Sequence, residues 1–194
     1  IQIFDLTELR DVTDPVTFEE TARYDGVASV HNITINEETG IGYSVGNSSG
    51  GETCGGGIHI IDLQEPANPE FLGCFSQPGT GRNGTGYTHD AQCVTYRGPD
   101  EEHDSKEICF GSNETAFSIA DVTDPANTEA LGLATYPDVA YTHQGWLSED
   151  HTYFFQGDEL DEGDGRKTRT LIWDIADLDD PQLAKEFFGT HEST

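Results

Sequence analysis

Polar and apolar residues alternate with a period of two in several short stretches of this chain. HNITIN (31–36) is the clearest case, and IGYSVG (41–46) and EICFGS (107–112) are short apolar runs that follow turn residues. Runs of this length, bounded by Gly, Asn, Asp and Glu, are typical of β-strands in antiparallel sheets. No stretch places apolar residues at helical spacing. The pattern therefore predicts an all-β protein.

Aspartates that end predicted strands recur along the chain. Asp5, Asp62, Asp121 and Asp174 are separated by 57, 59 and 53 residues. Each is followed by an acidic residue and a proline, which form the pairs Asp14-Pro15, Glu65-Pro66, Asp124-Pro125 and Asp180-Pro181. The distance from aspartate to proline varies between copies. Loops tolerate such changes in length, whereas strands do not. These stretches indicate a repeated hairpin.

Histidines mark the same repeat at a second point. His31, His89 and His143 precede the next landmark aspartate by 31, 32 and 31 residues. Repeats of this length are typical of solenoids and propellers. Because each period contains four predicted strands and no helix, the sequence predicts a β-propeller of four-stranded antiparallel blades.

The blade boundaries follow from these landmarks. The predicted arc has about three and a half blades: a partial blade at 1–24 and blades at 31–78, 89–136 and 143–188. Such an arc would leave unpaired edges, so we expect a segment of a longer propeller. Partner chains that complete the ring are the alternative.

Composition narrows the class of protein. The 194 residues include 37 acidic and 9 basic ones, for a net charge of −28. This charge argues against nucleic acids and anionic membrane surfaces as partners. No apolar run reaches the length of a membrane span. Four cysteines and four Asn-x-Ser/Thr sequons favour a secreted or cell-surface protein. The sequons lie at Asn32, Asn47, Asn83 and Asn113, and the last three are our glycosylation candidates.

The positions of the cysteines predict two disulfides. Cys93 and Cys109 lie eight residues on either side of a hairpin midpoint near residue 101, so they should face each other across two strands. Cys54 precedes the third strand of its blade and Cys74 ends the fourth, which brings them together as well. A Cys/His zinc site is the alternative, and the missing C-x₂-C spacing disfavours it.

His31, His89 and His143 open the first strand of successive blades, the strand that lines a propeller's channel. Equal phase places the three imidazoles at one height, where they could bind a transition metal. Asn32, Asp90 and Gln144 would be oxygen partners of that site, directly or through the histidines. In the alternative interpretation each histidine is structural and binds the backbone of a neighbouring blade.

A second candidate metal site is the acidic stretch GDELDEGDGR (157–166). Asp158, Glu159, Asp161 and Glu162, with Asp164 nearby, could supply oxygens to calcium. The alternative is a solvated acidic loop. The glycine-rich stretch 46–57 lacks the lysine of a phosphate-binding loop and is interpreted as a flexible loop.

Several long strings resemble the LVIVD repeat and the choice-of-anchor B family of surface proteins. They are HNITINEETGIGYSVG, CGGGIHIIDL, GYTHDAQCVTYRGPD, EICFGSNE, YTHQGWLSEDHTYF, GDELDE and RTLIWDI, and the resemblance covers most of residues 1–190. It implies a secreted or surface-anchored propeller, and it implies no particular reaction.

Three functions remain open from the sequence. The leading hypothesis is an extracellular propeller for binding, adhesion or assembly, stabilised by cations, with a protein, a glycan or copies of itself as partner. A metal-dependent hydrolase or lactonase that uses the channel histidines is the second, although no catalytic residue is identified. The third is a structural subunit of a surface filament or sheath.

Overall fold

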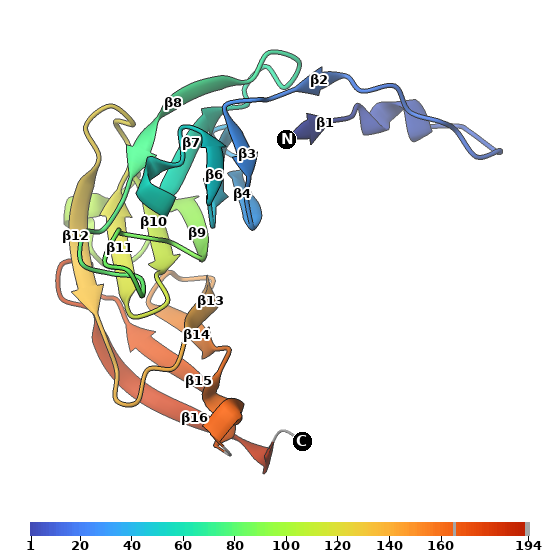
Figure 1. Ribbon diagram of the computed structural model, residues 1–194. Coiled ribbons are helices and arrows are strands. Elements are labelled where there is room, and N and C mark those ends of the chain that lie inside the picture. The colour runs from blue at the N-terminus through green and yellow to red at the C-terminus, as the bar shows by residue number, and fades with distance from the viewer. Residues whose placement is uncertain (165, 193–194) are drawn as a thin grey trace.

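The computed structural model describes residues 1–164 and 166–192, without the side chains of Glu162, Asp164, His191 and Glu192 (Figure 1). Its regular elements are β-strands and four short 3₁₀ helices, and the described residues contain no α-helix. The 3₁₀ helices are η1 (Leu6–Leu9), η2 (Cys54–Gly56), η3 (Glu101–His103) and η4 (Asp161–Asp164). None of the described helices is long and apolar enough to cross a membrane. The all-β prediction is confirmed.

Three four-stranded antiparallel sheets make up most of the chain. Sheet I contains β4 (Asn32–Asn36), β5 (Ile41–Val45), β7 (Ile58–Asp62) and β8 (Glu70–Phe75). Sheet II contains β9 (Asp90–Thr95), β10 (Glu107–Ser112), β11 (Phe117–Asp121) and β12 (Glu129–Ala134). Sheet III contains β13 (Thr142–Leu147), β14 (Tyr153–Asp158), β15 (Lys167–Asp174) and β16 (Gln182–Glu192).

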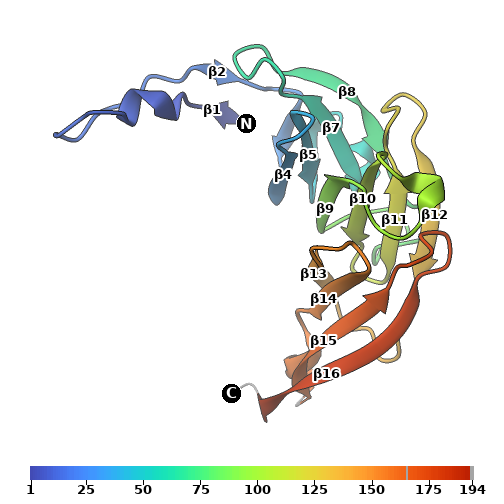
Figure 2. The same cartoon turned by 180° about the vertical axis from the view of Figure 1, so that it is seen from behind.

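The three sheets follow one another along an arc. Their first strands, β4, β9 and β13, lie on its concave side, and their last strands, β8, β12 and β16, lie on its convex side (Figures 1 and 2). Strand β9 contacts both β4 and β13. Residues that open the first strands are therefore neighbours in space, although more than 50 residues separate them in the sequence.

Two smaller sheets flank sheet I. Strands β1 (Gln2–Ile3) and β2 (Ala22–Arg23) pair at the start of the chain, and β3 (Val27–Ser29) pairs with β6 (Ser49–Gly51). The second pair lies partly within stretch 46–57, which also contains η2. The interpretation of that stretch as a flexible loop was wrong, because backbone pairing with β3 fixes it.

The repeated aspartate ends the third strand of each sheet and starts the turn that follows. Asp62, Asp121 and Asp174 accept hydrogen bonds from the backbone N–H two residues later, at 2.9, 3.0 and 3.1 Å. Asp5 does the same with Thr7, at 2.9 Å. This local bond reverses the chain without help from distant residues, which explains why the aspartate recurs.

A repeated glycine in the fourth strands receives the proline turn of the next sheet. A Cβ on Gly73 of β8 would lie 1.9 Å from the carbonyl oxygen of Pro125, and one on Gly132 of β12 would lie 2.3 Å from that of Leu178. Only glycine permits so close an approach of two backbones. Each proline turn therefore docks on the outer strand of the preceding sheet.

The hydrophobic core lies between the sheets. Tyr43 of sheet I is fully buried against sheet II. Phe117 of sheet II stacks on Phe154 and Trp173 of sheet III, with ring centroids 4.8 and 5.4 Å apart. These interfaces bury large aromatic side chains, so they contribute most of the hydrophobic stabilisation.

Candidate metal centre

The three landmark histidines converge on the concave side of the arc. His31 and His89 directly precede β4 and β9, and His143 is the second residue of β13. One nitrogen from each ring lies within 4.8 Å of the other two. The His89 ring is 4.0 Å from that of His31 and 4.8 Å from that of His143, between centroids.

Backbone hydrogen bonds hold the sheets together beside these histidines. Gly46 N–H, after β5, donates to Thr88 O at 2.7 Å and links sheet I to sheet II. Glu114 and Thr142 exchange two bonds, of 3.1 and 2.7 Å, and link sheet II to sheet III. The spacing of the imidazoles is therefore set by the backbone rather than by flexible side chains.

His89, at the centre, has one hydrogen-bonded ring nitrogen and one without a partner. Its Nδ1 lies 3.0 Å from the Tyr141 hydroxyl and 3.3 Å from the Tyr87 hydroxyl. Its Nε2 is buried and has no hydrogen-bond partner within the part of the chain that the structure describes. A metal-binding histidine usually bonds one nitrogen to a neighbour and gives the other to the metal. His89 has one ring nitrogen bonded to neighbours, and its Nε2 would be the nitrogen left for a metal.

The surroundings keep the imidazole of His89 neutral. Burial, and then the neighbouring rings of His31 and His143, lower the pKa of His89. A metal ion binds only the neutral form of histidine, so a lowered pKa reduces competition from protons. Burial, followed by the Glu114 carboxylate, raises the pKa of Tyr141, which stays a protonated hydroxyl near His89.

The predicted oxygen partners have contacts of their own. Asn32 Nδ2 donates to the Asp90 carboxylate at 3.2 and 3.3 Å, across the junction of sheets I and II. Gln144 is exposed to solvent. Glu159, which was assigned to the calcium candidate, lies near the histidines. Its Oε2 is 3.6 Å from His143 Nε2.

The described acidic side chains of stretch 157–166 lie in two places, with Glu159 near His143 and the other two beside Arg169. Asp158 and Asp161 are buried beside Arg169, whose Nε donates to Asp161 at 2.8 Å and whose Nη2 lies 3.5 Å from Asp158. Asp158 also accepts from the backbone N–H groups of residues 140, 141 and 160. The side chains of Glu162 and Asp164 lie outside the described residues. Arg169 therefore already pairs with the two buried carboxylates, and calcium binding at this stretch stays a prediction.

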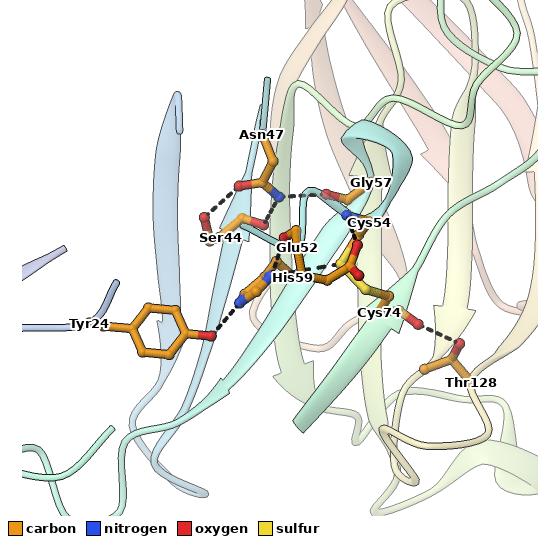
Figure 3. Close-up of a disulfide and its surroundings, with 9 residues drawn as sticks. All are labelled: Tyr24, Ser44, Asn47, Glu52, Cys54, Gly57, His59, Cys74 and Thr128. Carbon is orange, nitrogen blue, oxygen red and sulfur yellow. Dashed lines mark hydrogen bonds between the residues drawn. A yellow bond between two sulfur atoms is a disulfide. The ribbon is translucent and has the colours of Figure 1, made fainter. Parts of the chain in front are cut away.

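Both predicted disulfides are present, Cys54–Cys74 and Cys93–Cys109, and the described residues contain no free cysteine. The Cys54–Cys74 bridge joins η2 to β8, and the Cys93–Cys109 bridge joins β9 to β10. Figure 3 shows the Cys54–Cys74 bridge, with Thr128 Oγ1 donating to the carbonyl oxygen of Cys74 at 3.0 Å. The Cys54–Cys74 bridge therefore adjoins the contact between sheet I and sheet II.

A buried histidine lies beside the Cys54–Cys74 bridge. His59 is within hydrogen-bonding distance of the Glu52 carbonyl at 2.7 Å and of the Tyr24 hydroxyl at 2.5 Å (Figure 3). Glu52 also comes close to both sulfurs. A thiolate is needed for metal binding, and both sulfurs are bonded to each other, so this cluster is structural.

Two of the predicted glycosylation sites are buried. Asn47 is 2% exposed, and its Nδ2 donates to the carbonyls of Ser44 and Gly57. Asn113 is fully buried, and its Nδ2 donates to Thr80. A glycan on either would displace these bonds, so the burial of both asparagines argues against glycosylation of the folded chain. Asn83 is exposed, as is Asn32, so both remain accessible.

Sequence reasoning missed Tyr87 and Tyr141, which contact His89, and Glu114, which lies near both tyrosines. The signal was present, because the string Tyr-Thr-His occurs twice, at 87–89 and 141–143. Both tyrosines point to the same histidine, which only the side-by-side placement of β9 and β13 explains. Arg169 was missed because nothing local in the sequence places it between Asp158 and Asp161.

Comparisons with known proteins support the fold alone. No protein-family model and no curated protein matches the chain, so the resemblance to the LVIVD-repeat and choice-of-anchor B proteins stays a prediction. Among solved structures, the chain is similar to the crystal structure of a protein from Lactobacillus plantarum, a structural genomics target, with a TM-score of 0.56 and 11% sequence identity. The match covers 82% of this chain and 42% of that protein, so the chain spans less than half of its length.

Proposed function

We propose that this chain is an arc of an extracellular β-propeller whose inner rim binds a divalent transition-metal ion through His31, His89 and His143. The observation that carries the proposal is the convergence of three imidazoles, one from the start of each sheet. The bound ion would give the rim a fixed charge and an open coordination position for a ligand or partner.

Repetition of one packing contact supports the propeller arrangement. The register places Tyr43, Phe110 and Phe155 at the same position of the second strand in sheets I, II and III. Tyr43 packs against sheet II and Phe110 against sheet III, each fully buried. The same face of each sheet thus receives its successor, which is how blades follow one another around an axis.

The donor set indicates the class of metal. Imidazole nitrogen favours zinc, copper, nickel or iron, whereas calcium and magnesium prefer oxygen. Three protein ligands leave a tetrahedral ion one position for an external group, as in catalytic zinc sites. Glu159, 3.6 Å from His143, is near enough to accept a proton from a group bound at that position. The nearby carboxylate favours a metal-dependent hydrolase as the second candidate function. The first candidate function is adhesion or assembly through the rim.

Two disulfides are typical of an oxidising compartment, and they support export of the protein. Its partner would then be an extracellular protein or glycan that contacts the rim. The charge of −28 would concentrate cations at the surface and favour loading of the histidine site.

Elemental analysis by mass spectrometry tests the metal site. The chain is stripped with a chelator, loaded with zinc, dialysed and compared with His31→Ala and His89→Gln. His151→Asn is the matched control, because His151 lies in the turn before β14 and has a positive φ of 52° that asparagine tolerates.

We expect the native chain and His151→Asn to retain about one zinc per chain. Loss of one ligand should weaken binding by roughly tenfold or more. His31 is exposed, so its substitution should leave the fold intact if His89→Gln does not. Equal zinc retention in all four proteins would refute the site. Hydrolysis of simple esters or lactones by the zinc-loaded chain, lost in His31→Ala, would select the hydrolase, and its absence would select the binding module.

A further inference from the structure

A groove lies on the concave side of the arc, next to the histidines. Its volume is about 410 Å³, and it is lined by residues 32–36 of β4, residues 92–94 of β9 and Trp146 of β13. Because Asn32 directly follows His31, one end of this inner groove adjoins the metal centre. The lining combines first strands from all three sheets.

The lining of the inner groove contains no charged side chain. Its residues are asparagine, isoleucine, threonine, glutamine, cysteine, valine and tryptophan, whereas charged residues make up 24% of the chain. A charged ligand that entered this space would lose hydration and gain no opposite charge. The groove therefore fits a neutral ligand.

Trp146 offers a wide apolar face to such a ligand. It is 66% exposed, whereas Trp173, the second tryptophan, is 1% exposed and belongs to the core. An indole ring combines an apolar face with an N–H donor, which suits ligands that are apolar on one side and polar at the edge. Pyranose rings have this character, because their C–H groups form a face and their hydroxyls form the rim.

Two amides in the groove are fixed in orientation. Gln92 Oε1 accepts from the Leu147 N–H at 2.7 Å, and Asn32 Oδ1 accepts from the Ile33 N–H at 2.8 Å. Amides can donate to and accept from sugar hydroxyls, and fixed groups lose less entropy when a ligand binds.

We propose that the inner groove binds a neutral oligosaccharide, with a sugar ring against Trp146 and its hydroxyls on Asn32 and Gln92. This site goes beyond the metal centre and does not require it. An extended peptide pairs along an open strand edge, and β4 and β9 lie at the edges of their sheets, so a peptide is the alternative occupant. The exposed Trp146 favours the sugar, and an uncharged hexapeptide among the probes tests the alternative.

Calorimetry and tryptophan fluorescence test the proposal on the full chain. The probes are three neutral hexasaccharides (cellohexaose, xylohexaose and chitohexaose), a charged hexagalacturonate and an uncharged hexapeptide of Ser, Asn and Gly. The variants are Trp146→Ala and Trp146→Phe. Phe187→Ala is the control, because Phe187 of β16 is 58% exposed and does not line the groove.

At least one neutral hexasaccharide should bind and shift the emission of Trp146 to shorter wavelength. Trp146→Ala should weaken binding by about tenfold or more, Trp146→Phe by less, and Phe187→Ala not at all. The emission of Trp173 reports whether each variant retains its core. Binding of hexagalacturonate or the hexapeptide alone, binding that survives Trp146→Ala, or binding of no probe would each overturn the proposal. Repeating the titrations with the chelated chain separates this result from the zinc result.

Discussion

Replacing Arg169 with methionine should destabilise the chain more than any other single change of a basic residue. The guanidinium is 6% exposed and donates to Asp161 at 2.8 Å and to Glu186 at 2.9 Å. It also donates to the carbonyls of Pro137 and Asp138, at 2.9 and 2.8 Å. Methionine keeps the aliphatic stem, so the variant removes the charge and its hydrogen bonds with little loss of volume.

The expected cost follows from what the variant leaves behind. Asp158 and Asp161 would stay buried without the guanidinium that contacts both, and loss of one partner of a buried ion pair costs about 3–5 kcal/mol. Arg97→Met is the control, because the ion pair of Arg97 with Glu38 is exposed at both ends. An exposed pair contributes about 0–1 kcal/mol, so the two variants should differ clearly.

The loss of unfolding free energy caused by Arg169→Met should be smaller at acidic pH. Burial already raises the pKa of Asp161 in the native chain, although Arg169 opposes this. Without Arg169 the folded pKa rises further above the unfolded value of about 3.9. The folded variant then binds more protons than the unfolded chain, so its stability falls as pH rises through that interval and is regained near pH 4.

Urea unfolding at pH 7 and pH 4.5 measures both effects, with the native chain and Arg97→Met in parallel. The reasoning is refuted if Arg169→Met loses less than about 1 kcal/mol at pH 7, the value for a surface pair. It is also refuted if the difference between Arg169→Met and the native chain grows as the pH falls.

Three further predictions follow from buried contacts. Gly132→Ala should lower the free energy of unfolding by about 1–3 kcal/mol in urea, because its Cβ would lie 2.3 Å from a backbone oxygen of the next turn; an unchanged midpoint would contradict this. Glu107→Ala should cost about 1–3 kcal/mol in the same assay, because the Tyr43 hydroxyl, which donates to Glu107 at 2.5 Å, loses its acceptor inside the core; Tyr43→Phe in the same background should then cost nothing more. When the chain is secreted from eukaryotic cells, Asn83→Gln should remove one glycan by mass, and Asn113→Gln should remove none.

The sequence predicts those parts of the fold that depend on local bonds. Asp62, Asp121 and Asp174 end their strands because each binds the backbone two residues later. The pairing of Cys93 with Cys109 follows from counting along one hairpin, since the structure pairs these two residues directly. Such features need no knowledge of how one sheet lies on the next.

Features that depend on contact between sheets escaped prediction. Asp158 was assigned to calcium from its acidic neighbours, yet the register places it at the same position as Asn113, a buried residue of sheet II. Side chains at that position bond to the segment that precedes the first strand of the sheet, to the Thr80 hydroxyl in sheet II and to the Tyr141 N–H in sheet III. Alignment of the repeats therefore predicts the burial of Asp158, whereas the acidic composition of stretch 157–166 does not. The burial of Asn113 could not be predicted for a similar reason, because a sequon carries no information on burial.

The contacts of the three histidines favour the proposed binding site over a structural contact that is repeated in each sheet. A structural histidine in a repeat would make the same backbone bond in every copy. Among the described residues, none of the three imidazoles bonds to backbone: His89 meets two tyrosine hydroxyls, His143 lies near Glu159, and His31 is exposed. The phase of the repeat brings them together, while their partners differ from sheet to sheet. Equal placement with unequal partners supports the proposed single site shared by three sheets, in which each ligand would meet the ion from a different side.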